Sequence, residues 1–335
     1  SSLPSPRAGS MRTPESTQIK VYYPSVEPYT LRDLCYSVHE DGVHVVYFNE
    51  PKKLNRWMAN TMAEMALVVE HFRRAESVRA VVWTGKGRAF SSGAAWEASP
   101  KLHVPLPVVK EYVKRGLMGK PPIPTSDGAD MVLKNFVLCC LKFPKPSICA
   151  VNGLSVGVAV NFAWFCHDYV IASPQAKFRY PFSELGIVPE ASSSLLLPQL
   201  VGLVAAKSIF ILGDWIPADE AHRLGLVQET VPPNELLKRA IAVARKSARK
   251  SRVSVGLIKQ LLLENRGGVK RISDALDREQ AYINKAMSLP DFKAAMKKFR
   301  SKHHRRSKKK TKETQMRSSS KNSSSQNKMR LTSKL

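Results

Sequence analysis

The sequence lacks the features that define membrane-spanning and secreted proteins. No run approaches the roughly 18–20 apolar residues that a membrane-spanning helix needs, although 43% of the 335 residues are hydrophobic, enough for a core. The Ser- and Pro-rich segment 1–20 has no apolar stretch of the secretory kind. Pro4, Pro6, Pro14 and Glu15 disfavour an amphipathic mitochondrial presequence. We therefore expect a soluble intracellular protein.

Cysteine is scarce, and its distribution excludes several uses. The number of cysteines is odd, and no Cys-x-x-Cys or Cys/His spacing predicts zinc; the five are Cys35, Cys139, Cys140, Cys149 and Cys166. We interpret them as small apolar residues of a reduced interior.

Acidic residues are few: 27 Asp and Glu stand against 53 Lys and Arg, a net charge of +26. More than half of this excess lies in residues 297–335, where fifteen basic residues face one acid, Glu313. This low-complexity segment cannot bury a core, so we predict a disordered basic tail over 301–335. A solvated spacer and weak attachment to anionic membrane or RNA both fit its charge. Because aromatic residues are almost absent from it, specific nucleic-acid recognition is not expected.

The printed sequence ends in Ser333-Lys334-Leu335. This tripeptide is the peroxisomal address, and a flexible tail would present it to a receptor. We expect a peroxisomal import receptor as a partner, and a location in the peroxisome or a related organelle such as the glycosome.

Apolar periodicity predicts an α/β core over 31–233, after a disordered leader at 1–30. Strands are predicted at Val43–Phe48, Arg79–Thr84, Ser147–Val151 and Tyr169–Ala172, with a helix from about Met58 to Phe72 between the first two. Alternation of strand and helix favours parallel pairing. Residues 97–129 carry six prolines and predict either a lid or a disordered insertion.

Residues 234–300 predict a helical C-terminal region. Asn234 is the expected N-cap of its first helix, and Ser254 is expected to open the second. A third helix is predicted over roughly 273–287.

Two turns of small residues follow predicted strands. The first is Gly87 to Trp96 (GRAFSSGAAW), and the second is Val151 to Asn161 (VNGLSVGVAVN). Such turns leave backbone N–H groups free to face a ligand, and a following helix N-terminus favours negative charge. Two N–H groups converging from the two turns would form an oxyanion hole. Taken alone, each turn also fits a close-packed connection.

Four segments together resemble the enoyl-CoA hydratase/isomerase, or crotonase, family. They are PKKLN from Pro51, VRAVVWTGKGRAFSSGAAW from Val78, FPKPSICAVNGLSVGVAVNF from Phe143 and FRYPFSELGIVPEASSS from Phe178. The order and spacing match from about Val43 to Val231, and Phe143 to Pro146 with the closing SKL is most similar to peroxisomal Δ3,Δ2-enoyl-CoA isomerases. The resemblance implies a ββα spiral core, and a homotrimer or hexamer formed through the C-terminal helices.

The resemblance also implies the site. The backbone N–H groups of Ala94 and Val158 would form the oxyanion hole. An acyl-CoA thioester substrate would lie along residues expected near the CoA moiety: Lys52, Lys53, Leu54, Ser92, Gly93, Ala94, Ala95 and Trp96. No metal or redox cofactor is implied, because coenzyme A is part of the substrate and an enolate mechanism needs none.

The acid–base residues separate the activities of this family. Its hydratases use two glutamates, whose positions here hold Asn161 and Phe182, and neither side chain can ionise. Its Δ3,Δ2-isomerases use one glutamate, which corresponds to Glu190. The resemblance therefore implies isomerisation of 3-enoyl-CoA to 2-trans-enoyl-CoA in fatty acid β-oxidation, with apolar neighbours raising the pKa of Glu190. Without the resemblance, Glu190 also fits an acid at a helix start, and Glu184 is expected to be structural or exposed.

Two alternatives stay open. A hydratase or hydrolase of the same fold could recruit another acid, Glu97 or Asp130, at the ends of the insertion. A non-catalytic binding module of the same fold could use the basic tail, with the terminal tripeptide a coincidence.

Overall fold

A computed structural model describes residues 20–23, 26–95, 129–299 and 301. Its described strands are β1 (Lys20–Tyr23), β2 (Val26–Thr30), β3 (Leu34–Val38), β4 (Val43–Phe48), β5 (Ala80–Gly85), β6 (Ala89–Ser91), β7 (Ser147–Val151), β8 (Leu154–Val156), β9 (Tyr169–Ala172), β10 (Lys177–Arg179), β11 (Ile216–Pro217) and β12 (Glu229–Thr230). Its described helices are η1 (Glu40–Gly42), η2 (Pro51–Lys53), α1 (Ala59–Arg74), α3 (Ala129–Leu141), α4 (Val158–Phe165), α5 (Phe182–Leu185), α6 (Ser193–Val201), α7 (Leu203–Leu212), α8 (Ala218–Arg223), α9 (Leu236–Ala248), α10 (Arg252–Asn265) and α11 (Gly268–Ser288).

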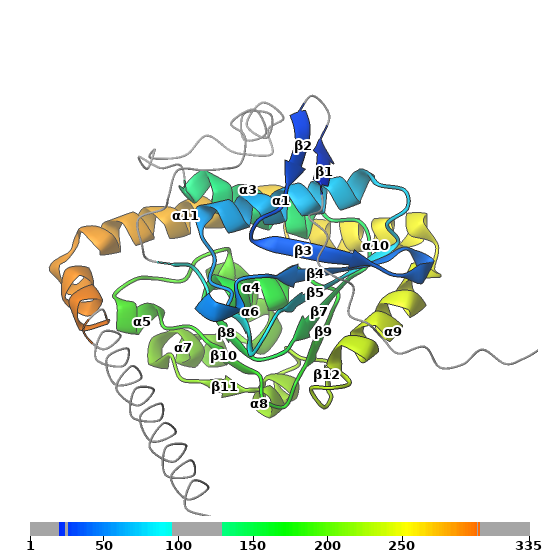
Figure 1. The fold of residues 1–335 in the computed structure, drawn as a ribbon. Helices are drawn as coiled ribbons and strands as arrows, with labels where there is room; N and C mark the ends of the chain where they lie inside the picture. The colour runs from blue at the N-terminus through cyan, green and yellow to red at the C-terminus, as the bar shows by residue number, and fades with distance from the viewer. Residues whose placement is uncertain (1–19, 24–25, 96–128, 300, 302–335) are drawn as a thin grey trace, which may run out of the picture.

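A six-stranded sheet forms the centre of the molecule, with strand order β12-β9-β7-β5-β4-β3 (Figure 1). All neighbours pair in parallel except β3 and β4, which form an antiparallel hairpin. The strands of its middle are runs of buried apolar residues, as expected for parallel strands covered on both faces.

A second sheet of four short strands, in the order β11-β10-β8-β6, lies beside the carboxyl ends of the large one. Strand β6 follows β5, and β8 follows β7, so successive strands pass from one sheet to the other. The strands β6, β8 and β10 pair in parallel. The two turns of small residues are therefore held side by side by β6–β8 pairing.

Helix α9 covers one face of the large sheet. Its small residues Ala240, Ala244 and Ala248 are buried against the valines of β4 and β5. Alanine at these positions lets the helix approach the sheet closely, and its other side, which includes Ala242, is exposed.

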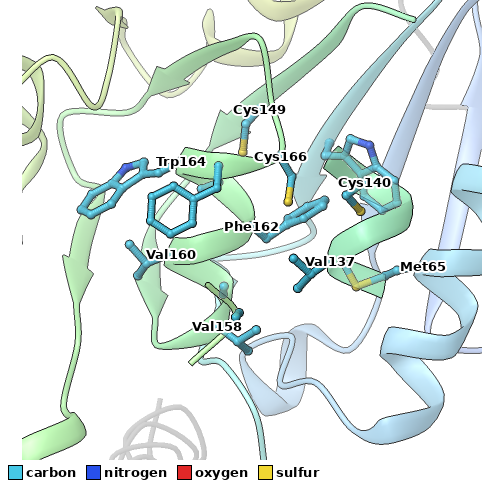
Figure 2. Packing of buried hydrophobic residues seen from close by; sticks show 14 of the residues in the cluster. Met65, Val137, Cys140, Cys149, Val158, Val160, Phe162, Trp164 and Cys166 are labelled. Atoms are coloured by element: carbon cyan, nitrogen blue, oxygen red, sulfur yellow. The ribbon is translucent and has the colours of Figure 1, made fainter. Parts of the chain in front are cut away.

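The opposite face carries the main core, built around α4. All eight residues of α4 are buried, which is typical of a helix enclosed by protein on every side. Figure 2 shows Val158 and Cys166 at the two ends of this helix, with Phe162 between them. The ring centroid of Phe162 lies within 6.4 Å of those of six other aromatic rings, namely Phe48, Trp57, Trp83, Phe90, Phe136 and His167. All five cysteines are free and buried, as the sequence predicts.

The α/β architecture predicted from the sequence is confirmed. The predicted strands at 43–48, 147–151 and 169–172 have the observed bounds, and the second strand is displaced by one residue. Two predicted helix starts are wrong. The N-cap of α9 is Glu235, so Asn234 lies outside the helix. The N-cap of α10 is Ser251, whose side chain accepts a hydrogen bond from the Ser254 N–H at 3.3 Å.

The third predicted C-terminal helix begins earlier than expected, at Gly268, and α11 packs on α3 and α6. The predicted disordered leader at 1–30 is wrong at its end, where β1 and β2 form an antiparallel pair. Residues 1–19, most of the 97–129 insertion and the tail from residue 302 lie outside the described residues, so the predictions for them rest on the sequence alone. Within the described ranges, no helix is long and apolar enough to cross a membrane.

The close approach of α9 to the sheet gives a test of the core. We expect A244L to lower the free energy of unfolding by about 1–3 kcal/mol, because the added carbons meet a filled interface. The matched change A242L, on the exposed side of the same helix, should stay within about 0.5 kcal/mol of the parent. Urea unfolding followed by circular dichroism measures both. Equal losses for the two variants would contradict the described packing.

Candidate functional site

The first turn places Ala94 beside Trp57. The Trp57 N–H donates to the Gly93 carbonyl at 2.8 Å, and the Ala95 N–H donates to the Trp57 carbonyl at 2.8 Å. In such parallel pairing the N–H of the residue between, Ala94, points away from Trp57. Within the described part of the chain, this N–H has no hydrogen-bond acceptor. It is therefore a donor that a ligand could use.

The second turn lies against the first. Gly93 has a φ of +81°, and a Cβ there would lie 2.4 Å from the Val156 carbonyl oxygen, so only glycine fits. Gly157 also has a positive φ, +57°, and it is the N-cap of α4. The first N–H groups of α4 therefore lie beside Ala94, at a helix N-terminus that carries a partial positive charge.

Glu190 brings a carboxyl group to this N-terminus. It lies in the loop between α5 and α6, and the Val158 N–H near its carboxyl group favours the charged form. One of its carboxyl oxygens, Oε1, would lie 3.8 Å from a Cβ placed on Gly157. Burial, with a smaller contribution from the charge of Glu279, raises the pKa of Glu190 to about 7, and the Val158 N–H opposes this shift. A carboxyl that titrates near neutrality can both take and return a proton.

The backbone of Glu190 is held from several sides. Its carbonyl oxygen accepts from Asn161 Nδ2 at 2.9 Å and from Ser193 Oγ at 2.6 Å. Tyr180 donates its hydroxyl to Asn161 Oδ1 at 2.5 Å. Asn161 is thus a satisfied buried amide that supports the loop. Glu190 itself precedes the first residue of α6 by three positions, outside the helix.

Phe182 lies in an apolar environment. Its ring centroid is 5.2 Å from that of Tyr180 and 6.1 Å from that of Phe210. Neither Asn161 nor Phe182 supplies a carboxyl group, so the two-glutamate arrangement is absent from these positions. Glu184 is exposed at the surface and pairs with Arg179 at 2.5 Å.

The segment expected along the CoA moiety lies next to the first turn. The Ser92 N–H donates to the Leu54 carbonyl at 2.9 Å. Lys52 and Lys53 are exposed in η2, and Lys53 pairs with Glu50 at 2.5 Å. The fold therefore brings 52–54 and 92–95 together. Trp96 and Glu97 lie outside the described residues, and of Asp130 only its backbone, at the start of α3, is described.

Glu279 is the residue near this site that the sequence analysis missed. It lies on α11, is 6% exposed, and its carboxylate accepts from the N–H groups of Ser192 and Ser194. Burial raises its pKa to about 7, and these donors from Ser194 and Ser192 oppose the shift. A charged residue in the apolar stripe of a helix, here between Leu276 and Ile283, is the signal that could have revealed it.

Comparison with known proteins identifies the family. The profile described as enoyl-CoA hydratase/isomerase matches residues 38–103 and 128–310. The chain therefore belongs to the enoyl-CoA hydratase/isomerase family, and its fold is the crotonase fold. Among the described residues, no group of three or more His, Cys, Asp or Glu side chains could hold a metal ion.

Relatives of both activities are similar to this chain. A short-chain-enoyl-CoA hydratase of Clostridium acetobutylicum is 34% identical over 261 residues, covering 78% of this chain and 92% of that protein. The peroxisomal enoyl-CoA delta isomerase 3 of Mus musculus is 31% identical over 226 residues, covering 66% and 65%. An enoyl-CoA hydratase/isomerase of Pseudoalteromonas atlantica has a similar structure, with a TM-score of 0.67 at 26% identity over 81% of this chain and 98% of that one.

The raised pKa of Glu190 predicts a pH-dependent stability. A buried acid whose folded pKa lies above its unfolded value stabilises the fold while protonated, and this stability is lost as pH rises from about 4.5 through about 7. At pH 9, E190Q should therefore be more stable than the parent, by on the order of 1–3 kcal/mol. Near pH 4.5 the difference should vanish.

Urea midpoints at pH 4.5 and pH 9 measure this effect. The control E184Q changes an exposed carboxyl, and its small effect should not grow from pH 4.5 to pH 9 in the same way. If E190Q and the parent had equal midpoints at pH 9, the Glu190 carboxyl would ionise without penalty, and the described burial would be wrong.

Proposed function

We propose that this protein is a Δ3,Δ2-enoyl-CoA isomerase that converts 3-enoyl-CoA to 2-trans-enoyl-CoA. The observation that carries the proposal is the half-buried Glu190 carboxyl, with a pKa raised to about 7, at the junction of the two small-residue turns. The two ionisable side chains that a hydratase of this family uses are replaced by Asn161 and Phe182. Isomerases occur among the similar proteins, including the mouse enzyme.

The proposed reaction is a 1,3-proton shift. The Glu190 carboxylate takes a proton from C2 of the 3-enoyl-CoA, and the electrons of that C–H bond delocalise to the thioester oxygen. The N–H groups of Ala94 and Val158 stabilise the resulting dienolate, and each such donor contributes about 10²–10³ in rate in comparable enzymes. The same carboxyl then returns the proton at C4, which moves the double bond into conjugation. One carboxyl group is sufficient because it returns at C4 the proton that it took from C2. It is therefore ionised again at the end of each turnover.

The Val158 N–H has two roles in this proposal. In the structure it lies near the Glu190 carboxyl group and favours its charged form, whereas the reaction assigns it to the thioester oxygen. These two acceptors compete for one donor, so the substrate oxygen would replace the carboxylate there. The exchange would leave Glu190 free to approach C2.

The cellular setting is proposed from the sequence and one relative. A peroxisomal location agrees with Ser333-Lys334-Leu335 and with the peroxisomal mouse isomerase. A role in fatty acid β-oxidation follows from the substrate class.

The activity is tested with purified protein and 3-hexenoyl-CoA, following the conjugated product spectroscopically. We expect the parent to isomerise it and E190Q to lose about 10²-fold or more, because the amide cannot act as the base. The control E184Q removes an exposed carboxyl six residues earlier and should keep the activity. Neither the parent nor E190Q should hydrate 2-hexenoyl-CoA.

Each other outcome rejects a part of the proposal. Hydration of 2-hexenoyl-CoA by the parent would favour the hydratase alternative. A parent that binds CoA esters without converting them would favour the binding module. Full isomerase activity in E190Q would show that another group moves the proton.

We further propose that the chain assembles as a homotrimer or hexamer. Helix α10 exposes five large apolar side chains at helical spacing, at 54–71% exposure: Val253, Leu257, Ile258, Leu261 and Leu262. A second exposed apolar surface lies on α6 and α7 and includes Leu203, Val204 and Ile211. Apolar surfaces of this extent are typical of contacts between subunits.

The assembly is tested by mass photometry. We expect the parent to be a trimer or hexamer and L261E to dissociate, because a charge would be buried in the interface. The control A242E adds the same charge to the exposed side of α9 and should leave the assembly intact. A monomeric parent would refute the proposed assembly.

A further inference from the structure

Glu279 is a buried acid whose hydrogen bonds all go to the N-terminus of α6, at Ser192 and Ser194, where the loop that carries Glu190 ends. Its side chain projects from the inner face of α11, in line with Ile272, Leu276 and Ile283. A carboxyl group at such a position is costly to bury unless donors surround it. Three donors do so, all within two residues of Ser192.

Three hydrogen bonds tie Glu279 to Ser192 and Ser194, and we call this set of bonds the clamp. Glu279 Oε2 accepts from the Ser192 N–H at 2.7 Å, and Oε1 accepts from the Ser194 N–H at 2.9 Å and from Ser194 Oγ at 2.5 Å. Every one of these partners donates, which suits an ionised carboxylate that can only accept. Donor and acceptor are 85 or more residues apart in the sequence.

The turn needs such a partner. Ala191 and Ser192 both have positive φ values, 55° and 64°, a conformation that side chains other than glycine rarely adopt. Ser192 is the N-cap of α6, yet its own side chain makes no capping bond, and its Oγ is buried with no partner among the described residues. Glu279 therefore supplies from another helix the acceptors that an N-cap residue ordinarily provides.

The same carboxylate acts on Glu190 through its charge. Repulsion from Glu279 is the second cause, after burial, that raises the pKa of Glu190. Two other groups belong to this environment: Tyr180, whose own pKa is raised by burial and by both carboxylates, and Arg278, which lowers the pKa of Glu279. The charge of Glu279 thus contributes to the raised pKa of Glu190.

We propose that Glu279 is a positioning residue, which fixes the Glu190 carboxyl at the N-terminus of α4 by holding the strained turn at Ser192 and Ser194. The inference rests on the proposed function for its kinetic consequences. Its structural part, the clamp on the turn, stands independently of the reaction.

The clamp is tested by amide hydrogen exchange of the peptide spanning residues 186–200. In E279Q the amide must turn an N–H toward one of the backbone donors, so we expect exchange in this peptide to be about 10-fold faster or more. The control D274N removes one negative charge from the same helix at a residue paired with Lys270, and it should exchange like the parent. If E279Q does not fold, S194A takes its place in the test. It removes only the hydroxyl donor, so we expect a smaller increase in the exchange rate.

The positioning role is tested by pH profiles of isomerisation. E279Q should lower kcat by on the order of 10- to 100-fold with KM within about 3-fold, because a misplaced base slows the chemical step. The ascending limb of the pH–rate profile of E279Q should move to lower pH, because the Glu279 charge no longer repels the charge of Glu190. E279D keeps the charge on a shorter side chain, so it should lower kcat without moving the limb.

The outcomes separate this inference from the proposed function. Unchanged exchange in E279Q or S194A, or a parent-like kcat and limb in E279Q, would refute the role of Glu279 even if the parent isomerises normally. If the parent does not isomerise while E279Q accelerates exchange, the clamp stands and the proposed reaction falls. A kcat loss equal in E279Q and D274N would indicate a general charge effect and reject the clamp.

Discussion

The site depends on keeping a half-buried carboxyl group ionisable at neutral pH. Glu190 lies half-buried beside the start of the buried helix α4, and desolvation together with the charge of Glu279 raises its pKa to about 7. A more exposed carboxyl would be a weak base at neutral pH, and one without the Val158 N–H would resist ionisation further. The two sheets, the buried α4 and the loop before α6 together set this balance.

The topology explains how distant segments reach one point. Each of β5 and β7 leaves the large sheet into a short strand of the small one, and pairing of β6 with β8 brings the two turns into contact. Glycine at 93 and 157 makes that contact possible, since a Cβ on Gly93 would meet the Val156 carbonyl oxygen at 2.4 Å. Helix α11 then returns across α3 and α6 and delivers Glu279 to the loop from outside the α/β core.

Much of this could be predicted from the sequence, and the failures share a physical origin. Buried parallel strands are runs of apolar residues, so three of them were predicted with their observed bounds. Helix starts were less predictable: Ser251 and Ser254 are both good capping residues, and only the folded backbone decides between them. Glu190 was predicted through the family resemblance. Glu279 was missed because its partners Ser192 and Ser194 are more than 80 residues away in the chain.

The position of the Val158 N–H beside the Glu190 carboxyl group has a consequence for the proposed reaction. A carbonyl oxygen that captures the Val158 N–H deprives the carboxylate of a donor that stabilised its charged form. Losing that donor raises the proton affinity of the carboxylate. In the proposed reaction, a thioester oxygen bound at the Val158 N–H would therefore make Glu190 a stronger base, so that its full basicity develops only once the substrate is bound.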